Sequence, residues 1–225
     1  MTPSIVFDFD GTLALGHGPV IAFARAIADQ AGADYLARVD AALADYDAGH
    51  SEYRDGYDIV TKLGITDGVT TEALQAAYNV SRESLGTSDG AVGTMNDLAG
   101  FLTTVGGSAR LVLATNAPET GIDRVLASWG VTELFDEKHF TVGKPAGLES
   151  LIARLIKDGP VLAIGDIAEN DLVPAQPFGA DTALVGATAQ TNPITATMRG
   201  ASLGALRSDI EAWVASAAAG ATPAA

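Results

Sequence analysis

Residues 5–13 read Ile5-Val6-Phe7-Asp8-Phe9-Asp10-Gly11-Thr12-Leu13, an apolar run that ends in two carboxylates, a glycine and a hydroxyl. The β-branched and aromatic residues at its start predict a buried strand. Aspartate is a poor strand former and is costly to bury without a partner, so two aspartates at the end of a core strand require an explanation. Side chains two positions apart on a strand point the same way, so Asp8 and Asp10 can face one point. We therefore expect a cation, a phosphate group or both to bind there.

Strand and helix patterns alternate along most of the chain. This alternation predicts an α/β fold, a Rossmann-like, doubly wound parallel sheet core covered by helices on both faces. Besides the first strand, we expect extended segments at 111–114, 138–142, 161–164 and 182–185, and helices at 119–129, 148–156, after Glu169 and at 206–218. Ligands bind at the carboxyl ends of the strands in such sheets, so the polar residues that follow each strand are the first candidates for a site.

A mostly helical stretch between the first and second strands predicts an inserted α-helical cap domain over residues 15–87, and the core then comprises 1–14 and 88–225. Within the cap we expect helices at 19–31, 33–48, 51–63 and 70–85, with Ser51 and Thr70 as N-caps and Gly49, Gly64 and Gly86 as helix ends. An insertion at the ligand-binding end of the sheet would act as a lid and set specificity. Candidates for that role are Arg25, Arg38, Tyr46, His50, Tyr53, Arg54 and Tyr57.

The composition limits the classes of binding partner and the cellular compartment that we expect. The chain has 13 Lys plus Arg against 28 Asp plus Glu, a formal net charge of −15, which argues against binding nucleic acid or an anionic membrane. It contains no cysteine, so disulfides and thiolate metal sites are excluded. No apolar run approaches the roughly 18 residues of a membrane span, and the N-terminus lacks a signal peptide's basic start. We expect a cytoplasmic protein.

Three further polar clusters lie at predicted strand ends or just before a predicted helix. They are Thr115-Asn116 after the second strand, Gly143-Lys144-Pro145 before the helix at 148–156, and Gly165-Asp166 to Asp171 after the strand at 161–164. Each cluster alone is compatible with an ordinary turn, a solvated lysine or a helix cap. Their common place at one end of a parallel sheet makes a shared site the stronger interpretation.

These four clusters, in this order, resemble the motifs of the haloacid dehalogenase-like hydrolases, and the resemblance covers residues 5–186. The first motif, residues 8–13, is the most specific of the four. The helical insertion is similar to the small cap that one branch of the family carries after its first strand. The resemblance implies a phosphatase that hydrolyses a small-molecule phosphate monoester through an aspartyl-phosphate intermediate.

The resemblance also implies a role for each motif residue. Asp8 would be the nucleophile and Asp10 the general acid that later activates water. Lys144 would supply a fixed positive charge, with Gly11, Thr12, the Thr115 hydroxyl and the Asn116 backbone N–H holding the transferred group. The implied metal ligands are the side chains of Asp8, Asp166 and Asp171, the last directly or through water, and the backbone carbonyl of Asp10.

A divalent cation is expected because the charges otherwise repel one another. Two like charges 4 Å apart cost roughly 4 kcal/mol at an effective dielectric near 20, and a phosphate dianion also repels an attacking carboxylate. Mg²⁺ is the expected cofactor because it prefers oxygen ligands and is held by carboxylates, phosphate and water. The absence of cysteine and the presence of only three histidines disfavour zinc.

Several alternatives stay open at this point. Lys138 and Lys157 could replace Lys144, although the adjacent Pro145 favours Lys144 because proline suits a helix start. His17 lies near the place where many relatives carry an acidic or hydroxyl residue, and it is a candidate for the contact that closes the cap. Asp10 disfavours a dehalogenase, which needs no general acid. A sugar-phosphate mutase with the same core residues and a non-catalytic phosphate-binding protein are the remaining alternatives.

Overall fold

The computed structural model describes residues 1–50 and 52–220, so the predicted N-cap Ser51 lies outside the described residues. The chain divides into two compact units. The core unit contains Met1–Leu15, Thr94–Glu119 and the chain from Leu126 onward, and the helical unit contains Gly16–Gly93 and Thr120–Val125. The limits of a cap at 15–87 stay a prediction.

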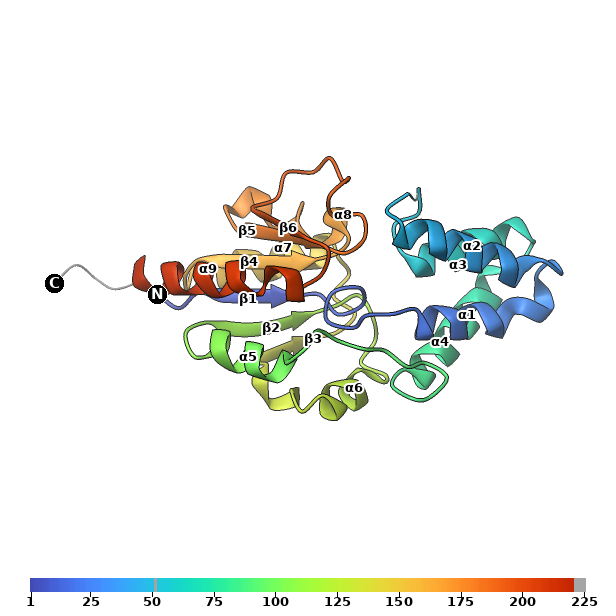
Figure 1. Ribbon diagram of the computed structural model, residues 1–225, viewed down its shortest axis with the longest axis horizontal. Helices are drawn as coiled ribbons and strands as arrows, with labels where there is room; N and C mark the ends of the chain where they lie inside the picture. The colour runs from blue at the N-terminus through green and yellow to red at the C-terminus, as the bar shows by residue number, and fades with distance from the viewer. Residues whose placement is uncertain (51, 221–225) are drawn as a thin grey trace. The chain divides into compact units, whose positions relative to one another are not determined.

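The core unit is built on a parallel β-sheet with the strand order β3-β2-β1-β4-β5-β6 (Figure 1). Its strands are β1 (Ser4–Phe7), β2 (Arg110–Ala114), β3 (Glu137–His139), β4 (Val161–Gly165), β5 (Asp181–Val185) and β6 (Met198–Gly200). Every neighbouring pair runs parallel, and Ile5 of β1 lies opposite Leu111 of β2 and Leu162 of β4. The direction of strand order reverses beside β1, which is where ligands bind in open α/β sheets. The predicted α/β, Rossmann-like core is confirmed.

Helices cover both faces of this sheet (Figure 1). They are α5 (Leu98–Gly106), α7 (Ala146–Leu155), α8 (Ala168–Asp171) and α9 (Arg207–Gly220), while α6 (Ile122–Ser128) spans the limit between the two units. Val6 points to the face covered by α7, where it shares a buried cluster with Leu148 and Ile152. Phe7 points to the opposite face and meets Phe101 of α5 edge-on, with ring centroids 6.4 Å apart. Burial of both faces explains the unbroken apolar run of β1.

The helical unit consists of α1 (Gly18–Ile27), α2 (Tyr35–Asp47), α3 (Gly56–Thr66) and α4 (Thr71–Ser84). Their apolar stripes meet in one buried cluster that includes Phe23, Ile27 and Ile59. Thr70 is the N-cap of α4, as predicted, because its side chain accepts a hydrogen bond from the N–H of Ala73. The apolar side chains of these helices therefore form a core of their own.

Short helices complete the chain. They are the 3-10 turns η1 (Ala28–Gln30), η2 (Thr132–Leu134), η3 (Gln176–Phe178) and η4 (Gly204–Leu206). The helix predicted after Glu169 is only the single turn α8 followed by η3, because Pro174 and Pro177 interrupt it. Among the described residues, no helix combines the length and the apolar composition needed to cross a membrane.

Further local details differ from the sequence-based expectation. The helix predicted at 51–63 begins only at Gly56, where the Asp55 side chain caps it by accepting from the Asp58 N–H. Helix α5 and the edge strand β6 were not predicted; α5 carries two glycines and two threonines, and burial of Phe101 outweighs their weak helix propensity. Gly64 does not end a helix but lies inside α3, so that prediction is wrong. A Cβ at Gly64 would lie only 3.0 Å from Ile27 Cδ1, so the glycine permits close packing of α3 on α1.

Candidate active site

Asp8 lies directly after β1, at the carboxyl edge of the sheet. Its N–H donates to the Ile164 carbonyl at 2.9 Å, so pairing with β4 continues one residue past the strand and holds the backbone in place. The Lys144 Nζ donates to Asp8 Oδ1 at 2.7 Å, although 136 residues separate the two in sequence. The Asp8 side chain keeps 12% of its surface exposed, so a small part of it stays accessible.

The loop after Asp8 turns back sharply and approaches β4. The Phe9 carbonyl accepts from the N–H groups of Leu13 at 3.0 Å and Ala14 at 2.8 Å. Gly11 has φ +81°, a left-handed conformation that favours glycine, and a Cβ there would lie 2.2 Å from Asp166 Oδ2. Only glycine therefore lets this loop lie against Asp166. The Thr12 side chain points inward, and its hydroxyl is buried without a hydrogen-bond partner in the described structure.

Two further carboxylates follow β4. Asp166 comes directly after the strand, and Asp171 ends the single turn α8, whose Asp171 N–H donates to the Ile167 carbonyl at 2.9 Å. In return, Asp171 Oδ2 accepts from the Ile167 N–H at 3.2 Å. A Cβ at Gly165 would lie 2.1 Å from Asp171 Oδ2, so Gly165 leaves the space that this carboxylate occupies. The requirement for a small residue at Gly165 was missed from the sequence; its place before Asp166 is the signal that could have revealed it.

Lys144 lies between two carboxylates and is almost fully buried. Its Nζ donates to Asp171 Oδ1 at 2.7 Å as well as to Asp8, and its side chain is 3% exposed. Burial lowers the pKa of Lys144, but the charges of Asp8 and Asp171 outweigh burial and raise that pKa above its usual value. For Asp171, burial first and the charge of Asp8 second raise the pKa, and Lys144 opposes them. Lys144 is therefore held as a cation.

Thr115 and Asn116 follow β2 and lie against the segment that carries Lys144. Thr115 is buried, its N–H donates to the His139 carbonyl at 3.0 Å, and its Oγ1 accepts from the Ala117 N–H at 3.0 Å. Asn116 Oδ1 accepts from the Lys144 N–H at 2.6 Å, and Asn116 Nδ2 donates to the Lys144 carbonyl at 3.3 Å. The side chain of Asn116 thus binds the backbone of Lys144, a contact that the sequence analysis did not foresee.

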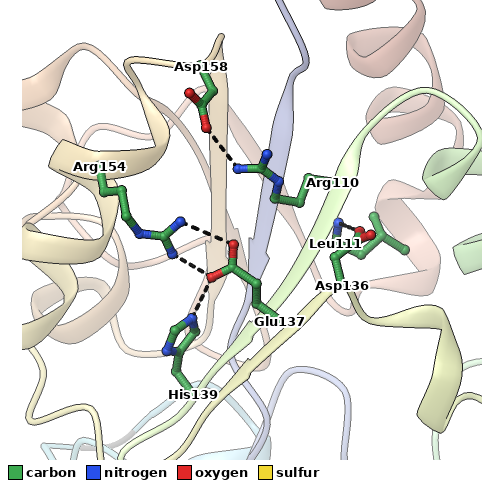
Figure 2. Close-up of polar contacts among 7 residues, drawn as sticks. All are labelled: Arg110, Leu111, Asp136, Glu137, His139, Arg154 and Asp158. Carbon is green, nitrogen blue, oxygen red and sulfur yellow. Dashed lines mark hydrogen bonds and ion pairs between the residues drawn. The ribbon is translucent and has the colours of Figure 1, made fainter.

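Ion pairs fix the strand and the helix on either side of the Lys144 segment. Figure 2 shows Arg154 of α7 reaching the Glu137 carboxylate on β3, with His139 on the same carboxylate. Arg154 Nη1 donates to Glu137 Oε1 at 3.1 Å, and His139 Nε2 lies 2.8 Å from Glu137 Oε2. Arg154 first and His139 second lower the pKa of Glu137 to about 2, against the opposing effect of burial. Glu137 therefore stays ionised and ties α7 to β3.

Three of the predicted ligands form a group that fits a metal ion. One carboxylate oxygen from each of Asp8, Asp166 and Asp171 lies within 4.8 Å of the others. Two oxygens bound to one Mg²⁺ are at most about 4.2 Å apart, twice the usual bond length, so small side-chain movements would bring these three together. The donors are all hard oxygens, which suit Mg²⁺ better than zinc. The Asp10 side chain is not part of this group, and its backbone carbonyl stays the predicted ligand.

Several specificity candidates of the sequence analysis have structural partners inside the helical unit. Tyr57 packs against the rings of Phe23 and Tyr78, with centroids 6.3 and 5.6 Å away. Arg54 Nη2 lies 3.4 Å from Asp58 Oδ1. Other contacts include Arg38 Nε with Asp34 Oδ1 at 3.2 Å and His17 Nε2 with Asp47 Oδ1 at 2.9 Å. A role in specificity or closure stays a prediction for these residues.

Comparisons with known proteins point to one family. A family model described as a haloacid dehalogenase-like hydrolase matches residues 3–179. A sequence search of curated proteins found no match. The family model covers the loop after β1, the ends of β2 and β4, and Lys144, which are the segments that form the candidate site.

Solved structures share the fold at low sequence identity. YfnB of Bacillus subtilis, described as a HAD-hydrolase bound to magnesium, is 16% identical, with 93% of this chain and 98% of that chain covered and a TM-score of 0.61. A HAD phosphatase from Thermococcus onnurineus is 17% identical, with 92% and 97% covered and a TM-score of 0.56. A 2-haloacid dehalogenase from Pseudomonas syringae pv. Tomato is 16% identical, with 95% and 100% covered and a TM-score of 0.55. These structures show the fold and include both phosphatase and dehalogenase chemistry.

Proposed function

Because this chain belongs to the haloacid dehalogenase-like hydrolase family, we propose that it is a Mg²⁺-dependent phosphatase that hydrolyses the phosphate monoester of a small molecule. Family membership makes the chain a hydrolytic enzyme. The finer assignment rests on the charges at the carboxyl edge of the sheet and on the presence of two aspartates, Asp8 and Asp10, in the loop after β1.

The charge balance around Lys144 is the observation that carries the proposal. One ammonium against the three carboxylates of Asp8, Asp166 and Asp171 leaves a net charge of −2 when all four groups are ionised. Uncompensated charge in such a buried place is costly, and a divalent cation would neutralise it. The cation and Lys144 together would then attract an anionic phosphoryl group.

The chain's own residues can divide the reaction into two steps. Mg²⁺, when bound by these carboxylates, would shield the phosphoryl oxygens from them. Asp8 attacks phosphorus with a carboxylate oxygen, and the P–O bond to the alcohol breaks as the aspartyl-phosphate forms. Lys144 holds Asp8 Oδ1 at 2.7 Å, which orients the carboxylate for attack by its other oxygen. Asp10 gives a proton to the leaving alkoxide and later takes one from the water that releases phosphate.

Asp10→Asn is expected to separate these two steps. On an alkyl phosphate such as glycerol 2-phosphate, turnover should fall by about 10²–10⁴-fold because the leaving alkoxide needs a general acid. On p-nitrophenyl phosphate, whose leaving group is weakly basic, the variant should still form the aspartyl-phosphate and then stall. Rapid-quench measurements should show a burst of p-nitrophenol equal to the enzyme concentration. Equal losses on both substrates with no burst would contradict the acid–base role.

Gly11→Ala is expected to weaken Mg²⁺ binding by at least about 10-fold, because the new Cβ would displace Asp166. The collision distance of 2.2 Å to Asp166 Oδ2 leaves no room for a methyl group. Gly179→Ala is the matched control, since Gly179 has φ +76° with no atom within 4 Å of the added Cβ. Both variants should lose about 1–2 kcal/mol from backbone strain. Calorimetric titration with MgCl₂ measures the Mg²⁺ affinity of each variant. Equal Mg²⁺ affinities of Gly11→Ala and Gly179→Ala would show that Asp166 does not bind the ion.

One assay tests the proposed reaction against dehalogenation. The purified protein should release phosphate from p-nitrophenyl phosphate and from a panel of small phosphate esters with Mg²⁺, and EDTA should abolish this release. It should release no chloride from 2-chloropropanoate. A halide leaving group needs no general acid, so the presence of Asp10 favours phosphate esters as substrates. Chloride release without phosphatase activity would overturn the proposal, and activity confined to phosphoproteins would overturn its small-molecule part.

A further inference from the structure

We infer that the Asn116 side chain is the positioning residue for Lys144, through a two-point hydrogen bond to the backbone of that residue. The amide of asparagine offers one acceptor and one donor, as a peptide group does. Here the acceptor Oδ1 receives the Lys144 N–H at 2.6 Å, and the donor Nδ2 reaches the Lys144 carbonyl at 3.3 Å. The inference deepens the proposed function, on which its kinetic part rests.

Asn116 completes a series of contacts between two loops that follow β2 and β3. The Val142 N–H donates to the Thr115 carbonyl at 3.0 Å, and the Thr141 N–H donates to the Ala117 carbonyl at 3.0 Å. These backbone bonds hold residues 141 and 142 beside the end of β2, but they stop two residues before Lys144. The side chain of Asn116 continues the pairing across that gap.

The residues on either side of Lys144 are tied to the start of α7, where the Gly147 N–H donates to the Gly143 carbonyl at 3.0 Å and the Leu148 N–H to the Pro145 carbonyl at 3.1 Å, but the N–H and carbonyl of Lys144 take part in neither bond. Gly143 precedes Lys144 with φ +73° and has no atom within 4 Å of where a Cβ would lie, so no side chain packs against that side of the backbone. Pro145 follows it and has no N–H to donate. The Lys144 side chain must nevertheless reach both Asp8 and Asp171 at 2.7 Å. An anchor on its own N–H and carbonyl fixes where that side chain begins.

The side chain and the backbone of Asn116 therefore have different roles. The Asn116 side chain is engaged by Lys144, so it acts on the reaction through the lysine and not by touching the phosphoryl group. The predicted role of the Asn116 backbone N–H in holding that group is compatible with this assignment. Loss of the side chain should free the Lys144 backbone and disturb both ion pairs of its ammonium.

Lysine acylation provides a test that does not depend on activity. The chain has only four lysines, Lys62, Lys138, Lys144 and Lys157, and site-resolved mass spectrometry can follow each during treatment with an acetylating reagent. Wild-type Lys144 should react far more slowly than the exposed Lys157 because it is buried and doubly paired. In Asn116→Ala, acylation of Lys144 should accelerate several-fold while Lys62 and Lys157 keep their rates. The exposed Asn96→Ala is the matched control and should match wild type at all four lysines.

Kinetics supply the second readout. In Asn116→Ala, kcat for phosphate release should fall about 10–100-fold, as is typical when a supporting hydrogen bond to a site residue is removed, with a smaller change in KM. Asn116→Asp keeps an acceptor for the Lys144 N–H, so the rate of Lys144 acylation in this variant should lie between those of wild type and Asn116→Ala. If Asn116→Ala does not fold, Asn116→Asp provides the same test.

The outcomes distinguish this inference from the proposed function. Unchanged Lys144 acylation in both Asn116 variants would overturn the positioning role, even if activity falls, because the side chain would then act elsewhere. Faster Lys144 acylation in a protein whose wild type has no phosphatase activity would support the positioning role and reject the phosphatase assignment.

Discussion

Asp8→Asn is expected to reduce phosphate release from p-nitrophenyl phosphate by at least about 10³-fold, because removing the nucleophile of a covalent mechanism costs this much or more. The amide keeps the size of the carboxylate. Its oxygen can still accept the hydrogen bond that Lys144 Nζ donates to Asp8 Oδ1 at 2.7 Å in the wild-type protein. The fold should therefore survive, as far-UV circular dichroism and a thermal melt would show. Initial rates at saturating MgCl₂ are the measurement.

The control for this variant is a second aspartate-to-asparagine change. Asp209→Asn alters an exposed residue in the first turn of α9 and should leave the rate of phosphate release unchanged. Asp8→Ala should be as inactive as Asp8→Asn, since both lack the attacking oxygen. Phosphate release at the wild-type rate by either Asp8 variant would rule out an aspartyl-phosphate at this position.

Lys144→Met is expected to lower the free energy of unfolding by about 3–5 kcal/mol in the presence of EDTA, because removing one partner of a buried ion pair leaves uncompensated charge. The charges in question are those of Asp8 and Asp171, whose side chains are 12% and 5% exposed. Methionine fills a similar volume, so lost packing contributes little. Urea denaturation followed by fluorescence measures the difference.

The same variant also tests the cation. Mg²⁺ should restore part of the stability lost in Lys144→Met, because the ion supplies positive charge to the same carboxylates and ligands that bind only the native state stabilise it. Phosphatase activity should remain very low. Lys157→Met, which removes an exposed lysine, should change stability by no more than about 0.5 kcal/mol. A Lys144→Met protein as stable as wild type in EDTA would contradict the charge balance on which the proposed function rests.

The sequence alone was sufficient for the strands that lie in the middle of the sheet and for most helices. The apolar run before Asp8 and the helical spacing of residues such as Phe23 and Ile27 are local patterns that directly reflect burial. Helix α5 was missed although Leu98, Phe101, Leu102 and Val105 follow helical spacing, whereas the three-residue strand β6 shows no such pattern. Contact of Phe101 with Phe7 holds α5 against the sheet, and pairing with β5 at the edge of the sheet holds β6.

The order of polar clusters along the chain determined which residues could meet, since parallel strands bring their carboxyl ends to one edge. Only the tertiary structure decided how they meet. It places Lys144 Nζ between Asp8 and Asp171, leaves room at Gly11 and Gly165 for two carboxylates, and turns the Asn116 side chain onto the Lys144 backbone. The physical reason is the separation of the contacting residues along the chain. Strand and helix patterns are set by neighbours a few residues apart, whereas the contacts of Lys144 join residues 27 to 136 positions apart, and their distances depend on how the whole sheet and its loops pack.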